Sequence, residues 1–310
     1  MRLFAVILLV AVGEIGISHL AAQGTTAAIL GTVTDASGAA IAGATVRVNN
    51  TGTGQVQSAI TDTAGRFNAP NLSVGEYEVR ASREGFSSVL RSGITLTVGS
   101  QNVVNFVLAV GTAQQTITVQ GDVTQVETTN STVGALIDQV QMRELPLNGR
   151  DVESLIQLSP GVQNYYAGSA AIGTGTGANM REGRDPSISV AGSRPEGVAY
   201  LLDDQNLKTF YNRGLGSITG TSLGVDAIGE FETLTNTYSA QFGGNGAVMN
   251  SVSKSGTNSF HGSVYEFLRN SDLDARNFFD GSSVPPFQQN QFGGSLGGPI
   301  RRDRTFFFGN

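Results

Sequence analysis

The sequence predicts a mainly β protein, and three observations carry this prediction. Short runs in which apolar and polar residues alternate recur through most of the 310 residues, as in half-buried strands. Glycine is abundant, with 41 residues, and turn-forming clusters separate the runs. Charged residues make up 14%, well below the ~25% of an ordinary soluble domain.

The composition excludes several classes of protein. Because the chain has no Cys, it contains neither a disulfide scaffold nor a thiolate metal site. A pI of 5.0 and a net charge of −6 argue against a nucleic-acid partner. With 39% hydrophobic residues, the chain is not expected to be disordered throughout.

Residues 1–23 are predicted to be a secretory signal peptide. Arg2 precedes an apolar run over 3–12, and the small residues Ala21 and Ala22 follow near the expected cleavage site. The run is shorter than the roughly 20 residues that a membrane-spanning helix needs. We therefore expect an exported protein whose later membrane insertion uses β-strands; an N-terminal membrane anchor is the alternative.

Residues 24–110 are predicted to form a β-sandwich. About seven alternating runs lie between residues 27 and 110, which is typical of such a fold. The clusters at 35–38 and 62–65 predict turns in which Gly38 and Gly65 adopt a positive φ. Near the end of this unit, Val104, Phe106 and Leu108 share one face.

Motifs in this unit resemble the carboxypeptidase regulatory-like domain, a transthyretin-like, Ig-like sandwich. They are GxVxD at 31–35, IAGATV at 41–46, GRF at 65–67, LSVGEYEV at 72–79 and GF at 85–86. The resemblance implies a fold and no peptidase activity. It also implies a possible glycan contact, for which Phe67 and Tyr77 are candidate stacking platforms. Their burial tendency favours a place in the core instead.

A linker is predicted over 111–127, and it contains one short alternating strand. Such a strand can add to the sheet edge of a partner through main-chain hydrogen bonds, or it can simply be a linker strand. The strand consists of Thr116, Ile117, Thr118, Val119, Gln120 and Gly121.

Residues 128–255 are predicted to form an α+β domain. Leu136, Ile137 and Val140 have helical spacing, so we expect a helix within 133–158, interrupted at Pro146 and resumed after a cap at Asp151. A glycine-rich tract over 165–185 is predicted to be a loop. Strands are expected at 188–190 and 198–202, and a strand-turn-strand over 225–238.

This domain resembles the plug of a TonB-dependent outer-membrane receptor of the Oar-like branch. The motifs are LPLNGR at 145–150, LSPGV at 158–162, VAGSR at 190–194, LDD at 202–204, AIGEFE at 227–232, YSAQFGG at 238–244 and TNSFHG at 257–262. The resemblance implies plug–barrel ion pairs, for which the candidates are Arg150, Arg194, Asp203 and Glu230. It also places the strand 116–121 where a TonB box would lie.

Residues 256–310 are predicted to begin an outer-membrane β-barrel. Strands are expected at 259–270, 291–300 and from 305 onward, with a charged turn at 301–304. Phe292, Leu296 and Ile300 share one face, and small or polar residues share the other, as in barrel strands. Since plugged transporters have about 22 strands, we expect the chain to be a truncated product or an N-terminal fragment with an incomplete barrel.

Candidate catalytic and metal motifs are weak. The pair Ser251 and Lys254 matches S-x-x-K but runs into a turn, where the helix that this motif needs is not expected. Asp203 and Asp204 are adjacent, so on a strand they point to opposite faces. His261 has no His or Cys neighbour that would complete a metal site. We therefore expect no enzyme, no cofactor and no metal.

The combined resemblance implies substrate import across the outer membrane, with the N-terminal sandwich in the periplasm. The partners it implies are a TonB-type inner-membrane protein, outer-membrane lipid and an unknown substrate: a metal chelate, an oligosaccharide or a peptide. The alternative is a secreted or periplasmic binding module, with carbohydrate as its ligand, in which the sandwich carries the function.

Overall fold

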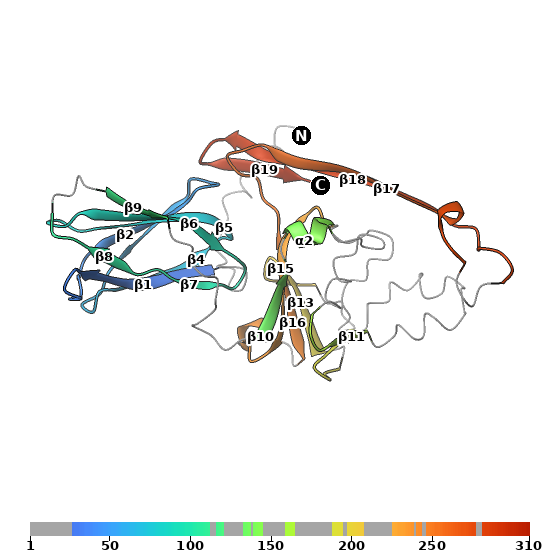
Figure 1. The fold of residues 1–310 in the computed structure, drawn as a ribbon, viewed down its shortest axis with the longest axis horizontal. Helices are drawn as coiled ribbons and strands as arrows, with labels where there is room; N and C mark the ends of the chain where they lie inside the picture. The colour runs from blue at the N-terminus through green and yellow to red at the C-terminus, as the bar shows by residue number, and fades with distance from the viewer. Residues whose placement is uncertain are drawn as a thin grey trace, which may run out of the picture.

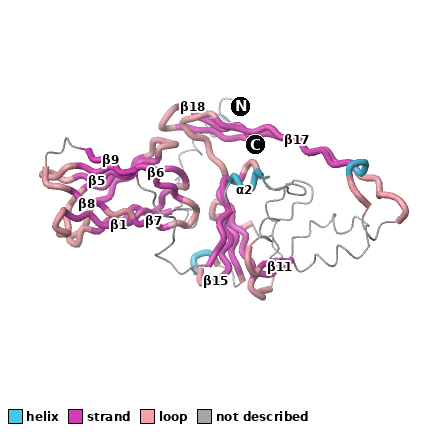
Figure 2. Tube along the Cα trace, viewed as in Figure 1, coloured by secondary structure: helices cyan, strands magenta, loops and turns pink. Residues whose placement is uncertain are grey.

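The computed structural model contains three β-rich units that follow one another along the chain (Figures 1 and 2). The sandwich is drawn at the left of Figure 1, the central unit in the middle, and the C-terminal sheet across the top. The predicted signal peptide, 1–23, lies outside the described residues. The structure describes residues 27–111, 116–120, 133–137, 139–144, 159–164, 188–194, 197–207, 225–238, 240–243, 246–276 and 281–310.

The first unit is a sandwich of two sheets, as the alternating runs predict. In the first sheet, β1 pairs antiparallel with β4 and parallel with β7 and β8. The second sheet has the order β3-β2-β5-β6-β9. The strands are β1 (Ala27–Asp35), β2 (Thr45–Asn50), β3 (Val56–Ile60), β4 (Arg66–Leu72), β5 (Gly75–Ser82), β6 (Ser88–Leu96), β7 (Gln101–Val103), β8 (Phe106–Leu108) and β9 (Thr116–Gln120).

The core of the sandwich consists of the inward residues of both sheets. Buried and half-buried residues alternate along β1, with Ile29 and Val33 fully inside. The rings of Phe67 and Phe106 lie 6.2 Å apart within this core. Gly31 is required in β1, because a Cβ at this position would collide with the carbonyl oxygen of Val104.

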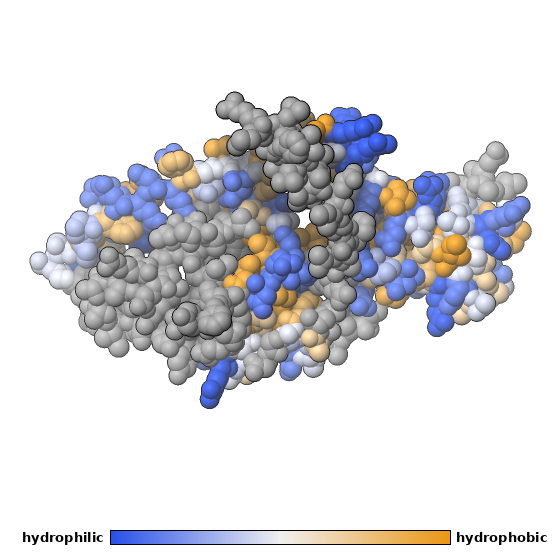
Figure 3. Space-filling model, turned by 180° about the vertical axis from the view of Figure 1, so that it is seen from behind, coloured by the Kyte–Doolittle hydropathy of each residue, from blue (hydrophilic) through white to orange (hydrophobic). Residues whose placement is uncertain are grey.

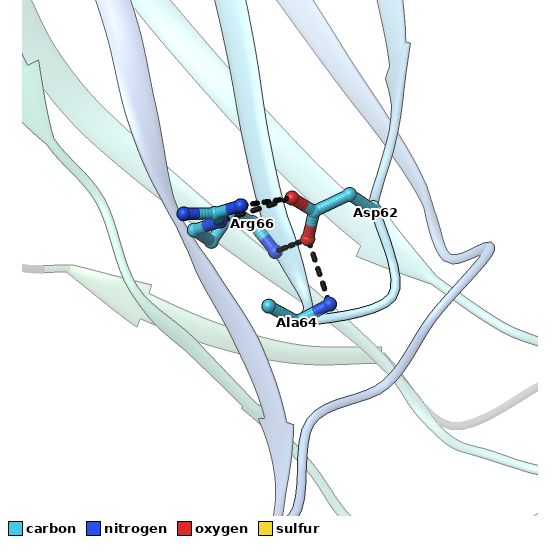
Figure 4. A network of polar contacts seen from close by, with 3 residues as sticks. All are labelled: Asp62, Ala64 and Arg66. Atoms are coloured by element: carbon cyan, nitrogen blue, oxygen red, sulfur yellow. Dashed lines mark hydrogen bonds and ion pairs between the residues drawn. The ribbon is translucent and has the colours of Figure 1, made fainter.

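The two predicted turns are confirmed, and each is built around an aspartate. Gly38 and Gly65 have φ values of 87° and 72°, the left-handed region that favours glycine. The Asp62 carboxylate accepts hydrogen bonds from the backbone N–H groups of Ala64 and Arg66 and pairs with the Arg66 guanidinium at 2.9 Å (Figure 4). Asp35 accepts equivalent bonds from Ser37 and Ala39.

The central unit contains a five-stranded sheet with the order β10-β15-β16-β13-β14. Apolar residues cover both faces: Phe231 and Met249 belong to one cluster, and Leu234 and Val248 to the other. The elements of this unit are β10 (Val133–Ile137), α2 (Gln139–Glu144), β11 (Val162–Asn164), β12 (Ile188–Val190), β13 (Val198–Leu202), β14 (Gln205–Asn206), β15 (Ile228–Asn236), η4 (Ala240–Phe242) and β16 (Ala247–Ser253).

Two predictions for the central unit are wrong in part. The first residues of the predicted helix form strand β10, because the edge of β15 offers them backbone hydrogen bonds and Ile137 packs into the core. Only Gln139–Glu144 is helical before the described residues end, so Pro146 and Asp151 lie outside them. The predicted strand-turn-strand is one continuous strand, β15, held by neighbours on both sides.

The third unit is an antiparallel sheet with the order β17-β18-β19, and it confirms the predicted strands. The turn at 301–304 joins β18 to β19, and Asp303 adopts a φ of 60° in it. Among the described residues, no helix is long and apolar enough to cross a membrane. The elements are β17 (His261–Asn270), η5 (Ser271–Leu273), β18 (Gln288–Arg301) and β19 (Thr305–Gly309).

Candidate functional site

The C-terminal sheet has one apolar face that is open to its surroundings. Val264 is 93% exposed, Phe292 78% and Ile300 71%, and Leu268 and Leu296 lie on the same face. From behind, Figure 3 also shows apolar residues at the surface of the molecule, next to hydrophilic ones. Glu266, opposite Phe292, also lies on this face. An exposed face that is mostly apolar marks an interaction with lipid or with another protein.

The opposite face of the same sheet carries small and polar residues together with the aromatic rings of Tyr265 and Phe267, and it contacts the central unit. Ser263 and Ser295 lie opposite each other on β17 and β18, with their Oγ atoms 2.9 Å apart. The Ser263 hydroxyl also donates a hydrogen bond of 3.1 Å to Oδ1 of Asp226, a residue of the central unit that is 5% exposed. The polar face of the sheet therefore lies toward the central unit.

His261 belongs to this second face. Its ring stacks on Phe308 at 6.3 Å, and Nδ1 lies 3.0 Å from the carbonyl oxygen of Ser259. Among the residues that the structure describes, no group of three or more His, Asp or Glu side chains could hold a metal ion. The sequence pair Ser251 and Lys254 lies at the end of strand β16, where the S-x-x-K mechanism has no helix to use.

The four predicted plug–barrel residues lie in different places. Arg150 is outside the described residues. Arg194 is exposed, in a turn after β12. Asp203 lies in the turn after β13, where its carboxylate accepts hydrogen bonds from the backbone N–H and the hydroxyl of Ser253, at the end of β16. Glu230 lies on β15 and accepts a hydrogen bond from the backbone N–H of Val98 in the sandwich.

The sandwich contacts the central unit through Val98 and Glu230, and it also contacts the segment that precedes the C-terminal sheet. The backbone N–H of Asn258 donates to the carbonyl oxygen of Gly52 at 2.8 Å. The side chain of Asn258 also exchanges two hydrogen bonds with Asp303, of 2.8 and 2.9 Å. The loop after β2, the segment before β17 and the turn after β18 thus meet at one point.

The candidate partner-binding strand is part of the sandwich. Thr116–Gln120 forms β9, the last strand of the second sheet, and pairs in parallel with β6 from Ser88 to Ser92. Gly121 lies outside the described residues. By contrast, the candidate stacking residues Phe67 and Tyr77 are only 4% and 2% exposed, which confirms the expectation that they belong to the core.

Two carboxylates in turns of the sandwich have lowered pKa values. The hydroxyl of Ser37 and the N–H of Ala39 hold the pKa of Asp35 below its ordinary value of 3.8. The backbone N–H and then the guanidinium of Arg66 do the same for the pKa of Asp62. Both groups therefore stabilise turns of the sandwich in their ionised form.

Sequence reasoning missed the contacts that join the three units. Asp226 and Asn258 were not among the candidates, although both lie in or next to motifs of the receptor resemblance. The available signal was the alternation in β17, which places Ser263 on the polar face. It could not indicate which residue of the central unit would lie opposite.

Comparisons with known proteins agree with this architecture. Residues 28–109 match the family model of the carboxypeptidase regulatory-like domain, and residues 252–310 match that of an outer membrane beta barrel domain. The chain is 28% identical over 316 residues to the TonB-dependent transporter Oar of Myxococcus xanthus, covering 96% of this chain and 27% of that protein.

A second relative is a probable TonB-dependent siderophore receptor, PirA, of Acinetobacter baumannii. It is 28% identical over 178 residues, which cover 54% of this chain and 21% of PirA. The crystal structure of PirA aligns over 55% of this chain and 22% of its own, with a TM-score of 0.38 and 20% identity. The chain thus spans about a quarter of the length of the curated relatives that it matches. The chain is thus similar to the N-terminal part of TonB-dependent outer-membrane receptors such as Oar, and its residues 28–109 match the carboxypeptidase regulatory-like domain.

Proposed function

We propose that this chain acts in substrate import across the outer membrane, as the plug and first barrel strands of a TonB-dependent receptor. The observation that carries the proposal is the two-faced C-terminal sheet. Its exposed apolar face suits the hydrocarbon of the outer membrane, and its polar face meets the central unit at Ser263 and Asp226. Catalysis forms no part of this proposal.

In this proposal the central unit is the plug that closes the pore. A plug has to rearrange without unfolding the barrel around it, so its contacts to the wall should be few and polar. The Asp226–Ser263 hydrogen bond is a contact of this type. Arg150, Arg194, Asp203 and Glu230 remain candidates for further contacts to barrel strands beyond β19.

The energy for import would come from a TonB-type inner-membrane protein that engages the strand 116–121. Main-chain hydrogen bonding to an extended strand supports this role, because it needs no particular side chains. The substrate class stays open between a metal chelate, an oligosaccharide and a peptide.

The test is deletion of residues 116–121 in the receptor as it is expressed in its host. The deletion should abolish energy-dependent uptake and leave substrate binding to whole cells intact. A matched control replaces the same six residues by a different six-residue sequence of Thr, Ser and Gln, which keeps the length of the segment and its backbone donors and acceptors; uptake should then persist. Unchanged uptake after the deletion would contradict the assignment of this strand.

A further inference from the structure

Two turns of the sandwich contact two different units of the chain. The turn after β2, residues 51–54, lies against the segment that leads into β17, where the backbone N–H of Asn258 donates to the carbonyl oxygen of Gly52 at 2.8 Å. The turn after β6, residues 97–100, lies against the central sheet, where the backbone N–H of Val98 donates to the carboxylate of Glu230 on β15. The sandwich therefore bridges the central unit and the start of the C-terminal sheet.

The 51–54 turn is held in shape by the sandwich itself. Asn50 is 4% exposed, and its Oδ1 accepts hydrogen bonds from the backbone N–H groups of Gly52 at 2.9 Å and Thr53 at 3.0 Å. Gly54 has a φ of 73°, and a Cβ at this position would collide with the carboxylate of Asp303. The turn thus presents a fixed surface, and its glycine allows the turn that joins β18 to β19 to come close.

This contact lies at one particular end of the C-terminal sheet. It involves the short turn 301–304, whereas the longer connection over 271–287 lies at the other end of the sheet (Figure 1). In outer-membrane barrels the short turns face the periplasm and the longer loops face the outside of the cell. The sandwich therefore touches the rim of the sheet that a barrel of this type would turn toward the periplasm.

The two contacts of the sandwich differ in strength. Glu230 accepts its hydrogen bond with a carboxylate, and such charge-assisted bonds are roughly twice as strong as neutral ones. The donor residue Val98 is only 2% exposed, and a Cβ at Gly99 would lie 3.1 Å from Oε2 of Glu232, so this turn lies close against β15. The contact at Gly52 uses a neutral backbone N–H and a neutral carbonyl group. Of the two contacts, the one with the central unit is the stronger.

Building on the proposed function, we propose that the sandwich is a latch that holds the plug in the closed receptor. A movement of the central unit relative to the barrel wall has to break one of the two contacts, because the sandwich touches both units. Since the contact with the central unit is the stronger, the latch opens between Gly52 and Asn258, and the sandwich then moves together with the plug. In the closed state the latch adds to the polar contact between Asp226 and Ser263.

A disulfide lock across the weaker contact tests this proposal. A Cβ at Gly52 would lie 3.9 Å from the Cβ of Thr257, which suits a disulfide, and the chain has no Cys of its own. In the full-length receptor carrying Gly52→Cys/Thr257→Cys, the backbone amides of β15 should exchange hydrogen about tenfold more slowly after oxidation than after reduction. A matched control, Arg47→Cys/Arg80→Cys, links β2 to β5 within the sandwich and should exchange at the same rate in both states.

A second variant weakens the latch instead of locking it. Thr257→Arg places a large side chain against Gly52, so the amides of β15 should exchange about tenfold faster than in the wild type, while those of β1 stay unchanged. Ser255→Arg adds the same charge at an exposed position of the same segment and should leave the exchange of β15 at the wild-type rate. Equal exchange of the oxidised and reduced lock variant, or wild-type exchange in Thr257→Arg, would overturn the latch.

These measurements need neither a substrate nor an inner-membrane partner, so they separate the latch from the proposed function. If the lock slows the exchange of β15 while wild-type cells show no energy-dependent uptake, the proposed function fails and the sandwich still restrains the central unit. If exchange does not respond to the lock while deletion of 116–121 abolishes uptake, the proposed function stands and only the latch is rejected.

Discussion

The sandwich and the C-terminal sheet have the same alternation of residues and opposite surroundings. In the sandwich, the inward residues of β1, such as Ile29 and Val33, are fully buried between two sheets. In the C-terminal sheet, the apolar residues Val264 and Phe292 are more than three-quarters exposed. The two-residue period of a strand therefore determines which side chains share a face. Whether that face packs against protein or meets lipid depends on what lies opposite it in the folded protein.

The largest expected effect tests the buried side of this comparison. Phe106 is 1% exposed and packs against Phe67, so Phe106→Ala should lower the free energy of unfolding of the sandwich by about 3–5 kcal/mol. Hydrogen exchange of the backbone amides of β1, followed at increasing urea concentrations, measures this loss in the free energy of unfolding. The matched variant Phe292→Ala should leave those amides unchanged, and a comparable loss there would contradict the comparison.

The exposed side is tested by a charge on the apolar face. Val264→Arg should disfavour membrane insertion by about 2–4 kcal/mol if residue 264 lies near the middle of the bilayer, because arginine is costly there. The fraction of heat-modifiable receptor in the outer membrane measures insertion. Gln289→Arg changes the polar face of β18 and should insert normally; equal insertion of both variants would argue against a lipid-facing surface.

A smaller effect is expected at the contact between the central unit and the polar face of the C-terminal sheet. Asp226→Ala removes the acceptor for the Ser263 hydroxyl in a buried place and should destabilise the central unit by about 1–3 kcal/mol. Limited proteolysis of the central unit reports this loss. Asp226→Asn keeps an acceptor for the Ser263 hydroxyl, so this variant should be cleaved at close to the wild-type rate. If it were cleaved as fast as Asp226→Ala, the negative charge and not the hydrogen bond would stabilise this contact.

The smallest expected effect concerns pH. Because the folded-state pKa of Asp62 lies below 3.8, its stabilising contribution is complete above that pH and is lost as the pH falls through the folded value. The urea midpoints of the wild type and Asp62→Asn should therefore differ near neutral pH and converge in acid. A difference that stays constant down to the most acidic pH would contradict this assignment.

The sequence predicts the three-part architecture and most strand positions because alternation and turn chemistry are local. The turns at Gly38 and Gly65 and the strands of the C-terminal sheet follow directly from such signals. The prediction of a helix at 133–137 is wrong, because the helical spacing of Leu136, Ile137 and Val140 contains no information about the strand β15 with which this segment pairs. Long-range pairing overrides local propensity there.

The candidate site was only partly predictable for the same reason. The strand Thr116–Gln120 was identified from its pattern, but its pairing with β6 depends on a register between distant segments. Likewise, the contact of Glu230 with Val98 joins residues 132 positions apart. Such contacts come from how the folded units meet, which no local pattern encodes.

Spin labels on the C-terminal sheet test the central claim most directly. Single cysteines at Phe292 and Tyr265, which lie on opposite faces of this sheet, would be labelled in the receptor within the outer membrane. The label at 292 should be accessible to oxygen and shielded from a water-soluble nickel complex, and the label at 265 should be shielded from lipid. Equal access of the nickel complex to both labels would contradict the account.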